Sequence, residues 1–330
     1  MMGLWHHAAV FHGGKYMKVI LHYDAGPGLK DRLEVFKNQG LDISIIPVAD
    51  VGGFEHALGT CDVLWHVLEP VTADHMAKAL HLRLIQKIGV GVNTIDLEAA
   101  KSRAIEVCNM PSTNTQGVVE QTLLLMLSAL RLAPYMDQRT RAGNGWNFEA
   151  KLQDCLSELS GKTVGLVGYG EIPTRLTPIL IAMGAKVIYT ATSPKTVNNT
   201  TFCQLNDLLS QSDILSLHIP LTPETDKLIN VSALAQMKRG AVLINTTRGG
   251  VVDQNALVEA LKSGQLSAAG LDVFDQEPVD PNSPILALDN VVLSPHIGWL
   301  TRETLGQSFV VAAENCMRLK DGRDLLHRVF

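Results

Sequence analysis

The feature of this sequence that most constrains its fold is the alternation of short apolar, β-branched segments with helical stretches. Strands separated by helices pair in parallel, because a parallel connection needs a crossover of about a dozen residues or more, which a helix supplies. A second alternating series starts at Gly161 and continues to about Pro295. The chain is therefore expected to be an α/β protein with parallel sheets. In the first series the pattern predicts strands over Lys18–Tyr23, Ile43–Pro47, Val63–His66, Leu84–Ile88 and Ile105–Cys108, and helices over Gly28–Asn38, Thr72–Leu80 and Asp96–Ser102.

The pattern changes in the middle of the chain, where the alternation gives way to one long helical run over Thr115–Tyr135. The segment Arg139–Leu159 that follows is irregular and polar, which is typical of a connecting arm. The segment Thr301–Asp321 near the end is helical again. A length of 330 residues, at roughly 150 residues per domain, predicts about two domains.

Composition excludes several classes of protein. Apolar residues make up 46% of the chain and charged residues 18%, which is enough to fill a core and argues against a disordered chain. The formal net charge of −5 argues against a nucleic-acid partner, because such proteins carry basic patches. No segment approaches the roughly 18 uninterrupted apolar residues of a membrane span, so no membrane contact is expected.

The cysteines and the first residues favour a cytoplasmic protein without a resident metal. The five cysteines are scattered and form no C-x-x-C pair, as expected in a reducing compartment. The first residues include no apolar segment of signal-peptide length. We interpret His6, His7 and His12 as part of a loose extension before the first strand rather than as metal ligands.

A glycine-rich turn is predicted between the strand Thr163–Val167 and a helix that ends near Met183. The turn contains Gly168 and Gly170. In dinucleotide-binding folds the first glycine allows a tight turn and the second lets a pyrophosphate approach the backbone, while the helix N-terminus supplies free N–H groups. The position between a strand and a helix favours a phosphate site, with an ordinary connecting turn as the alternative.

Two departures from the dinucleotide-binding pattern lie at the expected cofactor-binding site. Pro173 stands where a third glycine normally allows close packing, and Pro178 is expected to kink the helix. After the next predicted strand, Lys186–Thr190, Ala191 occupies the position where a carboxylate normally binds the ribose hydroxyls. Nothing at that position repels a 2′-phosphate. The following residues offer two hydroxyls and a cation, which favours NADP(H), with a plain polar loop as the alternative: Thr192, Ser193 and Lys195.

Three ionisable side chains follow predicted strands in the second half of the chain. The strands Ala241–Asn245, Ala268–Leu271 and Val291–Leu293 lead into loops that contain, in that order, Arg248, Glu277 and His296. Ligands of an open parallel sheet bind outside the carboxyl ends of its strands, so these three side chains can converge on one crevice. Taken singly, each also fits an ordinary loop residue: a turn cation, an exposed acid and a capped histidine.

With these loops in place, the chain resembles the D-isomer-specific 2-hydroxyacid dehydrogenases. The matching runs are GKTVGLVGYGEI, HIPLTPET, INTTRGGVVDQNAL, AAGLDVFDQEP and LSPHIG, and KIGVGVNTIDLEAA fits the family's substrate-domain signature. The resemblance covers about Val63 to Thr301. It implies two Rossmann-like domains: a flavodoxin-like substrate domain built from residues 1–110 and 300–330, and an inserted NAD(P)-binding domain over residues 111–299. It also implies that the helix Thr115–Tyr135 crosses between the domains and that the protein forms a homodimer through the nucleotide domain.

The resemblance makes Arg248, Glu277 and His296 the catalytic residues of an oxidoreductase that transfers a hydride between nicotinamide and a 2-keto or 2-hydroxy acid. A histidine can give a proton to the carbonyl oxygen and take it back in reverse. Glu277 would orient the imidazole, and Arg248 offers planar donors for a carboxylate and a ketone oxygen. The implied substrate contacts are Val90, Gly91, Arg248, His296 and Trp299. The implied cofactor contacts are Thr115, Gly168, Gly170, Glu171, Ile172, Thr192, Ser193, Lys195, His218, Pro220, Thr225, Thr246, Arg248 and Asp272.

The expected substrate is a small, unphosphorylated 2-keto acid of the glyoxylate or hydroxypyruvate type. Phosphoglycerate dehydrogenases of this family carry an Arg-Ser pair where this chain has the run Trp65–Leu68, and phosphite dehydrogenases carry a lysine where it has Val90. The alternatives are a larger apolar or phosphorylated 2-hydroxy acid, and a nucleotide-sensing role like that of related corepressors. Sensing does not require the three catalytic side chains, so their presence argues against it. NADP(H) is the expected cofactor, with NAD(H) as the alternative.

Overall fold

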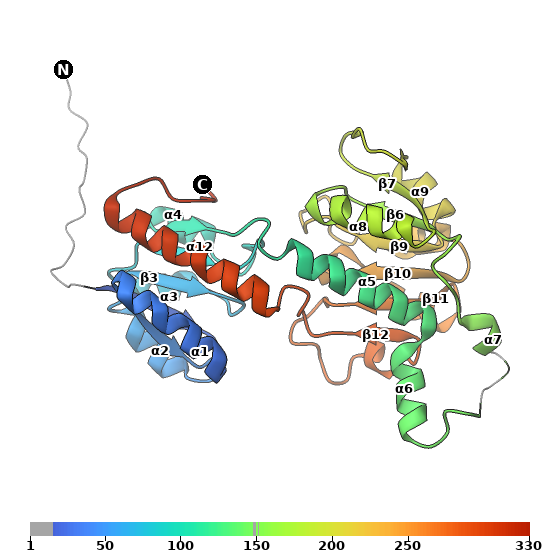
Figure 1. Cartoon of the computed structure of the whole chain (residues 1–330), viewed down its shortest axis with the longest axis horizontal. Helices are drawn as coiled ribbons and strands as arrows, with labels where there is room; N and C mark the ends of the chain where they lie inside the picture. Colours follow the sequence, from blue (N-terminus) through green and yellow to red (C-terminus); the bar gives the residue numbers. More distant parts are fainter. Residues whose placement is uncertain (1–15, 148–149, 151) are drawn as a thin grey trace. The chain divides into compact units, whose positions relative to one another are not determined.

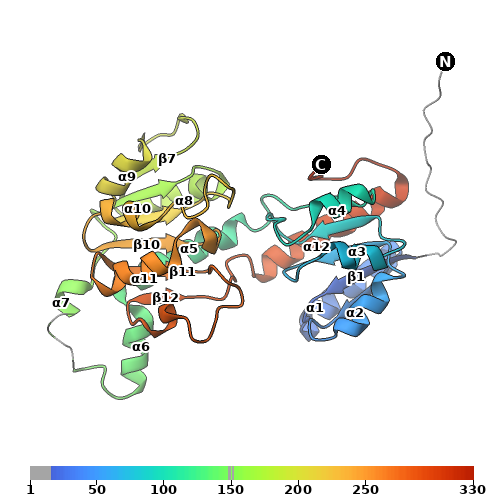
Figure 2. The same cartoon turned by 180° about the vertical axis from the view of Figure 1, so that it is seen from behind.

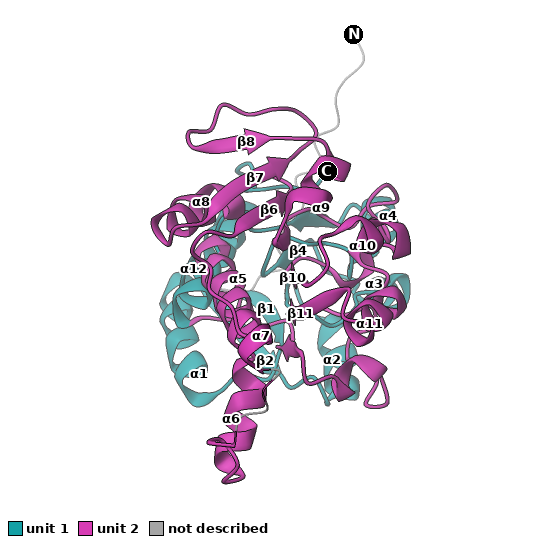
Figure 3. Cartoon of the chain, turned by 90° about the vertical axis from the view of Figure 1, so that its right-hand side faces the viewer, with its two compact units in different colours: residues 1–113, 302–330 teal, residues 114–301 magenta. Residues whose placement is uncertain are grey.

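The computed structural model describes residues 16–147, 150 and 152–330 (Figure 1). The chain divides into two compact units, which Figure 3 shows in different colours. The first unit contains the residues up to Thr113 together with Arg302–Phe330, and the second contains Asn114–Thr301. The sequence predicts one domain over residues 1–110 and 300–330 and the other over residues 111–299. His6, His7 and His12 lie outside the described residues.

The first unit is a five-stranded parallel sheet covered by helices on both faces. Its strands are β1 (Met17–His22), β2 (Leu41–Ile46), β3 (Val63–His66), β4 (Leu84–Lys87) and β5 (Glu106–Cys108), and its helices are α1 (Pro27–Leu33), α2 (Val51–Leu58), α3 (Ala73–Lys78), α4 (Leu97–Ser102) and α12 (Arg302–Asp321), with a 3₁₀ helix over Glu34–Gln39. The strand order β2-β1-β3-β4-β5 is that of flavodoxin-like folds. α1 and α12 cover the face seen in Figure 1, and α2, α3 and α4 cover the face seen in Figure 2.

Two helices of the first unit differ from the prediction. α1 ends at Leu33 and continues as a 3₁₀ helix, where the sequence predicts one helix over Gly28–Asn38. α2 is absent from the prediction, because Gly52 and Gly53 lower the local helix propensity. Asp50 stabilises the start of α2, since its carboxylate accepts a hydrogen bond of 2.9 Å from the Gly53 N–H.

The second unit is a seven-stranded parallel sheet. Its strands are β6 (Thr163–Val167), β7 (Lys186–Thr190), β8 (Thr200–Phe202), β9 (Ile214–Leu217), β10 (Ala241–Asn245), β11 (Leu266–Leu271) and β12 (Val291–Leu293). Its helices are α5 (Thr115–Arg131), α6 (Ala133–Arg141), α7 (Leu152–Cys155), α8 (Glu171–Ala182), α9 (Leu205–Gln211), α10 (Val231–Gln236) and α11 (Gln254–Lys262), with 3₁₀ helices over Gly249–Val251 and Pro284–Ala287. The strand order is β12-β11-β10-β9-β6-β7-β8, so the direction of winding reverses between β6 and β9. α5 and α8 cover the face seen in Figure 1, and α9, α10 and α11 cover the opposite face (Figure 2).

The long helical run in the middle of the chain is broken. α5 ends at Arg131, and Leu132 takes a left-handed backbone conformation with a φ of 47° before α6 begins. The prediction of one helix over Thr115–Tyr135 is therefore wrong at its C-terminal end. α5 lies wholly in the second unit, so the expected crossing between domains by this helix is also wrong. α6 and α7 overlap the arm that was predicted to be irregular, of which residues 148–149 and 151 lie outside the described residues.

α6 differs from the other helices of the second unit because none of its residues is buried. It extends away from the sheet in Figure 1. α5 and α6 are bent by 63° relative to each other. By length and composition only, the two helices together could form a bent membrane span. No single helix in the described part of the chain is long and apolar enough to cross a membrane.

α8 accommodates both prolines of the glycine-turn segment. Pro173 is the third residue of the helix, where a backbone N–H has no intrahelical partner to lose, and its ring is buried. Pro178 lies in the interior, and the helix nevertheless continues to Ala182. The second proline therefore does not end the helix that carries the glycine turn.

Gly168 and Gly170 provide a matched pair of variants, because the space around them differs. Gly168 has a φ of 94°, and a Cβ atom there would lie 2.5 Å from the carbonyl oxygen of His218, whereas a Cβ atom at Gly170 would meet nothing within 4 Å. We expect Gly168→Ala to lower the free energy of unfolding by more than about 2 kcal/mol, because it combines backbone strain with a clash. We expect Gly170→Ala to change it by no more than about 0.5 kcal/mol. Urea denaturation measures the free energy of unfolding of both variants. Equal effects of the two substitutions would contradict the difference in space around the two glycines.

Candidate active site

Four side chains from neighbouring strands lie along one edge of the second unit's sheet. β9, β10, β11 and β12 are adjacent and parallel, so the loops that follow them share the carboxyl edge of the sheet. The residues in these loops include, in strand order, His218, Arg248, Glu277 and His296. Three of these side chains were expected from the sequence to converge, and the order of the strands accounts for their proximity.

A short contact at this edge joins a histidine and a glutamate. His296 Nδ1 lies 2.6 Å from Glu277 Oε2, and the two side chains are 22% and 35% exposed. Glu277 Oε1 accepts a second hydrogen bond, of 2.9 Å, from the Phe274 N–H. Both carboxylate oxygens are therefore engaged, which holds the carboxylate in one orientation toward the imidazole. Arg248 donates from Nη1 to the carbonyl oxygen of Thr247 at 2.6 Å.

The surroundings of Glu277 keep its carboxylate ionised. Burial acts to raise the pKa of Glu277, but the hydrogen bonds from His296 and the Phe274 N–H and the charges of His296 and Arg248 outweigh it and lower the pKa. Burial lowers the pKa of the Arg248 guanidinium, and the Glu277 charge opposes that change. An acid with a lowered folded-state pKa stabilises the native protein above its unfolded-state pKa of about 4.3, and this contribution is lost as the pH falls through the folded-state value.

Asp272 organises the loop that carries His296. This aspartate follows β11 and is 1% exposed. Its Oδ1 accepts hydrogen bonds from Ser294 Oγ at 2.5 Å and from the Ile297 N–H at 3.0 Å, and its Oδ2 accepts one from the Gly298 N–H at 2.8 Å. The His296 N–H donates to the Asp272 carbonyl oxygen at 2.7 Å, and His296 has a φ of 55°. The resemblance had assigned Asp272 to the cofactor, and its anchoring of this loop was not foreseen.

The glycine turn lies at the switch point between β6 and β9 and fits a phosphate-bearing cofactor. The space beside Gly170 is open, and Gly170 precedes α8 without a side-chain cap, so the first N–H groups of the helix are available to a ligand. Glu171 and Ile172 supply these groups, because Pro173 has none. Thr115 Oγ1 donates a hydrogen bond of 3.0 Å to Glu171 Oε2.

His218 packs directly beside this turn. Its imidazole is partly buried, and burial lowers its pKa to about 3, which keeps the ring neutral. Nε2 lies 3.0 Å from Ser216 Oγ, and Nδ1 is buried without a hydrogen-bond partner among the described residues. A neutral ring with an unpaired nitrogen next to the open turn is consistent with the cofactor contact expected for His218.

The loop after β7 is held against the glycine turn. The Tyr189 hydroxyl bonds to both the N–H and the carbonyl oxygen of Lys195, at 2.8 Å each. Lys195 Nζ donates to the carbonyl oxygen of Tyr169, in the turn itself, at 2.5 Å. Thr192 and Ser193 are exposed in the same loop. The sequence indicated the cation but not that two tyrosines position it.

Other residues expected at the cofactor groove stabilise the loops after β9 and β10. Thr225 Oγ1 donates to the Pro220 carbonyl oxygen at 2.7 Å and accepts from the Thr222 N–H at 2.7 Å. Thr246 Oγ1 lies 3.1 Å from Thr122 Oγ1 on α5. These contacts shape the carboxyl edge of the sheet, and the cofactor roles of Pro220, Thr225 and Thr246 stay predictions.

Two of the expected substrate contacts lie in the first unit, after β4. Val90 is 46% exposed, and its carbonyl oxygen accepts a hydrogen bond of 2.9 Å from Asn109 Nδ2. Gly91 follows it in the same loop. Trp299, in the second unit, donates from Nε1 to the His296 carbonyl oxygen at 2.9 Å, which fixes its ring beside the histidine loop.

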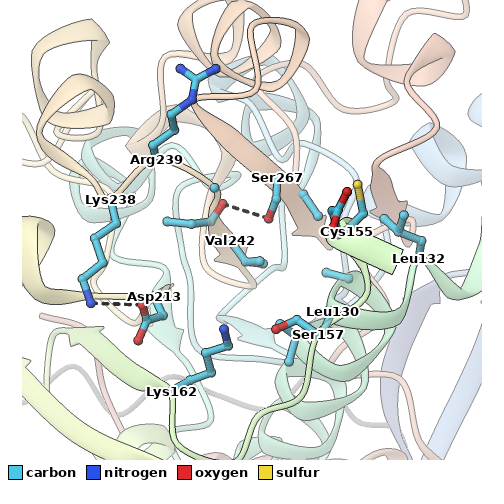
Figure 4. Close-up of a pocket in the computed structure, with 15 residues that line it drawn as sticks. Leu130, Leu132, Cys155, Ser157, Lys162, Asp213, Lys238, Arg239, Val242 and Ser267 are labelled. Carbon is cyan, nitrogen blue, oxygen red and sulfur yellow. Dashed lines mark hydrogen bonds and ion pairs between the residues drawn. The ribbon is translucent and has the colours of Figure 1, made fainter. Parts of the chain in front are cut away.

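A separate cavity lies at the opposite, amino edge of the second unit's sheet (Figure 4). It has a volume of about 240 Å³ and is lined by the starts of β10 and β11, among others. Its polar wall includes Lys162 and the ion pair of Lys238 with Asp213, at 3.0 Å. None of the expected site residues lines it. Among the residues that the structure describes, no group of three or more His, Cys, Asp or Glu side chains could hold a metal ion.

The fold and this edge define a class of protein. A parallel sheet in this strand order, with a glycine turn at its switch point, is a dinucleotide-binding domain. Residues 123–298 match the family described as D-isomer specific 2-hydroxyacid dehydrogenase, NAD binding domain. The chain belongs to this family of oxidoreductases, which act on CH–OH groups and bind a nicotinamide dinucleotide.

Similar proteins support this assignment over most of the chain. A glyoxylate reductase of Aeropyrum pernix is 40% identical over 270 residues, which are 79% of this chain and 81% of the relative. A hydroxypyruvate reductase of Thermotoga maritima is 39% identical over 236 residues, 71% of this chain and 76% of the relative. The crystal structure of the TT0316 protein from Thermus thermophilus is 35% identical, with a TM-score of 0.87, and the match covers 95% of this chain and 100% of that one.

The electrostatic coupling of Glu277 and His296 is open to direct measurement. We expect His296→Phe to raise the pKa of Glu277, because burial then acts against fewer opposing hydrogen bonds and charges. Carbon-13 NMR of the glutamate carboxyl follows this pKa. The stability that depends on ionised Glu277 should then be lost at a higher pH than in the wild type. His56→Phe, at an exposed position on α2, is the control, and an equal pKa in all three proteins would contradict the coupling.

Proposed function

We propose that the protein reduces a small, unphosphorylated 2-keto acid, of the glyoxylate or hydroxypyruvate type, to the corresponding 2-hydroxy acid. The observation that carries the proposal is the 2.6 Å contact of His296 with Glu277 at the edge of the sheet where Arg248 also lies. Relatives named glyoxylate reductase and hydroxypyruvate reductase support this substrate class.

In the proposed mechanism His296 is the general acid and base. Glu277 engages Nδ1, which leaves Nε2 as the atom that gives a proton to the carbonyl oxygen and takes it back in the reverse direction. The ionised Glu277 carboxylate stabilises the imidazolium and fixes the orientation of the ring. The bound nicotinamide dinucleotide supplies or accepts the hydride. Asp272 acts as a positioning residue, because its three accepted hydrogen bonds shape the loop around His296.

Arg248 is proposed to hold and polarise the keto acid. A guanidinium presents parallel donors in a fixed plane, which suits both a carboxylate and the neighbouring ketone oxygen. The backbone N–H groups of Val90 and Gly91 are proposed to bind the substrate carboxylate, and Trp299 to shape the pocket.

The end of β3 supports an unphosphorylated substrate. Trp65 is fully buried, packed against Phe36 and Phe309. His66 is 2% exposed, and burial together with the Lys87 charge lowers its pKa to about 3. A buried, neutral imidazole does not offer the cation that a phosphate group needs for charge-assisted hydrogen bonds.

Steady-state kinetics with a panel of 2-keto acids tests the proposed function. We expect the highest kcat/KM with glyoxylate or hydroxypyruvate and a low value with 3-phosphohydroxypyruvate. His296→Ala should lower kcat by about 10²–10⁴, the usual effect of losing a general acid, and change the dinucleotide Kd by no more than a few-fold. His56→Ala is the matched control. Dinucleotide binding without turnover of any keto acid would instead favour a nucleotide-sensing role.

A preference for NADPH over NADH is proposed from the loop after β7. Ala191 provides no carboxylate to accept hydrogen bonds from the ribose hydroxyls or to repel a 2′-phosphate. Lys195 is held at the glycine turn by its contact with Tyr169, and Thr192 and Ser193 present exposed hydroxyls. These three side chains are the proposed ligands of the 2′-phosphate.

Ala191→Asp tests the cofactor preference. A charge-assisted hydrogen bond is worth about 1.5–3 kcal/mol, so the wild type should favour NADPH by roughly ten-fold to a hundred-fold in kcat/KM. The added carboxylate should remove most of the NADPH activity and spare the NADH activity. Ala191→Asn, similar in size but uncharged, separates charge from bulk. Equal or better efficiency of the wild type with NADH would refute the preference.

We further propose a homodimer formed through the second unit, in the cytoplasm. No residue of α6 is buried, and Trp146 beyond it is 80% exposed. An isolated helix of nine residues is marginal in water, so contact with a second copy would stabilise it. All five cysteines are free thiols, which suits a reducing compartment.

A further inference from the structure

The first residue of α8 is an acid at the proposed binding site of the dinucleotide's pyrophosphate. Glu171 begins the helix, and Gly170 before it has no side chain that could cap the helix. A helix N-terminus favours anions through its free N–H groups and its dipole. Glu171 therefore places a fixed negative charge beside a site that suits a negative ligand. This inference rests on the proposed binding of the dinucleotide at the glycine turn.

The Glu171 carboxylate is tied to its position by Thr115. Thr115 Oγ1 donates a hydrogen bond of 3.0 Å to Glu171 Oε2, and Thr115, the first residue of α5, is 3% exposed. Because α5 and α8 pack on the same face of the sheet, this hydrogen bond links two fixed helices. Glu171 is itself exposed, and this hydrogen bond holds its carboxylate near the first turn of α8.

Lys195 provides the opposite charge at the same turn. Its Nζ donates to the Tyr169 carbonyl oxygen, and the Tyr189 hydroxyl fixes the backbone that carries it. Lys195 is exposed, so water and salt screen its attraction for a phosphate group. At the glycine turn Lys195 thus favours a bound pyrophosphate and Glu171 opposes it.

We propose that Glu171 limits the affinity of this enzyme for its dinucleotide and thereby hastens dinucleotide release. Like charges repel, and water and salt around the exposed Glu171 side chain weaken this repulsion without removing it. The pyrophosphate is common to NADPH and NADH, so the repulsion lowers the affinity for both and does not select between them. Product release often limits turnover in enzymes. A lower affinity for the oxidised dinucleotide shortens that step.

A binding titration with Glu171→Gln tests this role. The variant keeps the size of the side chain and an oxygen that can accept from Thr115, and it removes the charge. We expect Kd for both NADPH and NADH to fall about ten-fold at low salt, measured by nucleotide fluorescence, and the dissociation rate in stopped-flow experiments to fall by a similar factor. The difference in Kd between the variant and the wild type should become smaller at 1 M salt, where the Debye length is about 3 Å. Glu259→Gln, an exposed acid on α11, is the matched control and should leave Kd unchanged.

The direction of the effect separates this proposal from a structural role. A damaged turn would bind the dinucleotide less tightly, whereas loss of a repulsion makes it bind more tightly. ADP-ribose, which has the pyrophosphate but no nicotinamide, should show the same gain. Unchanged or weaker binding by Glu171→Gln, a gain that salt does not reduce, or no gain with ADP-ribose would overturn the inference alone. Failure of the wild type to bind any of these nucleotides would also overturn the proposal that the dinucleotide binds at the glycine turn.

Discussion

The parallel pairing of the seven strands in the second unit is the constraint on which the rest of that unit depends. Parallel strands all end at the same edge of a sheet, so the loops after β6, β9, β10, β11 and β12 share one edge although about 130 residues of chain run from Gly168 to His296. The reversal of winding between β6 and β9 directs the connecting helices to opposite faces. This leaves the glycine turn uncovered, and the proposed cofactor site and the proposed catalytic site therefore share one edge of the sheet.

Within this edge a buried carboxylate gives the histidine loop its shape. Asp272 accepts hydrogen bonds from Ser294, Ile297 and Gly298, which compensate the cost of burying its charge. The same hydrogen bonds hold the His296 backbone at a positive φ, a conformation that few residues adopt without such support. The resulting orientation directs Nδ1 to Glu277. The proposed proton transfer thus depends on a residue that does not touch the reacting atoms.

The glycine turn shows how a fold tolerates departures from its usual sequence pattern. Gly168 satisfies the two demands that cannot be relaxed, a positive φ and close packing on the His218 carbonyl group. The third glycine position is less strict, because Pro173 fits the first turn of a helix without losing a hydrogen bond. Both signs of charge lie at this site, with an acid at the start of α8 and a cation from the loop after β7. The balance of these charges, rather than the glycine pattern alone, is proposed to set the affinity for the dinucleotide.

The sequence by itself determined the α/β class, the family, the parallel sheets and the loops in which the candidate catalytic residues lie. It also predicted five strands residue for residue, because buried parallel strands are short apolar runs set apart by their own neighbours in the chain: β3, β6, β7, β10 and β12. It did not predict α2, where two glycines obscure the helical pattern and an aspartate caps the helix. It also did not predict the break at Leu132, two residues before Pro134, although proline is common in the first turn of a helix and poorly tolerated in its interior. The resemblance implied that Glu277 orients His296, and the tertiary structure gave their 2.6 Å contact. Only the tertiary structure decided that Asp272 holds the histidine loop and that Lys195 reaches the glycine turn. The physical reason is that each of these contacts joins loops far apart in the chain, and their distances depend on strand order and register, which no local pattern encodes.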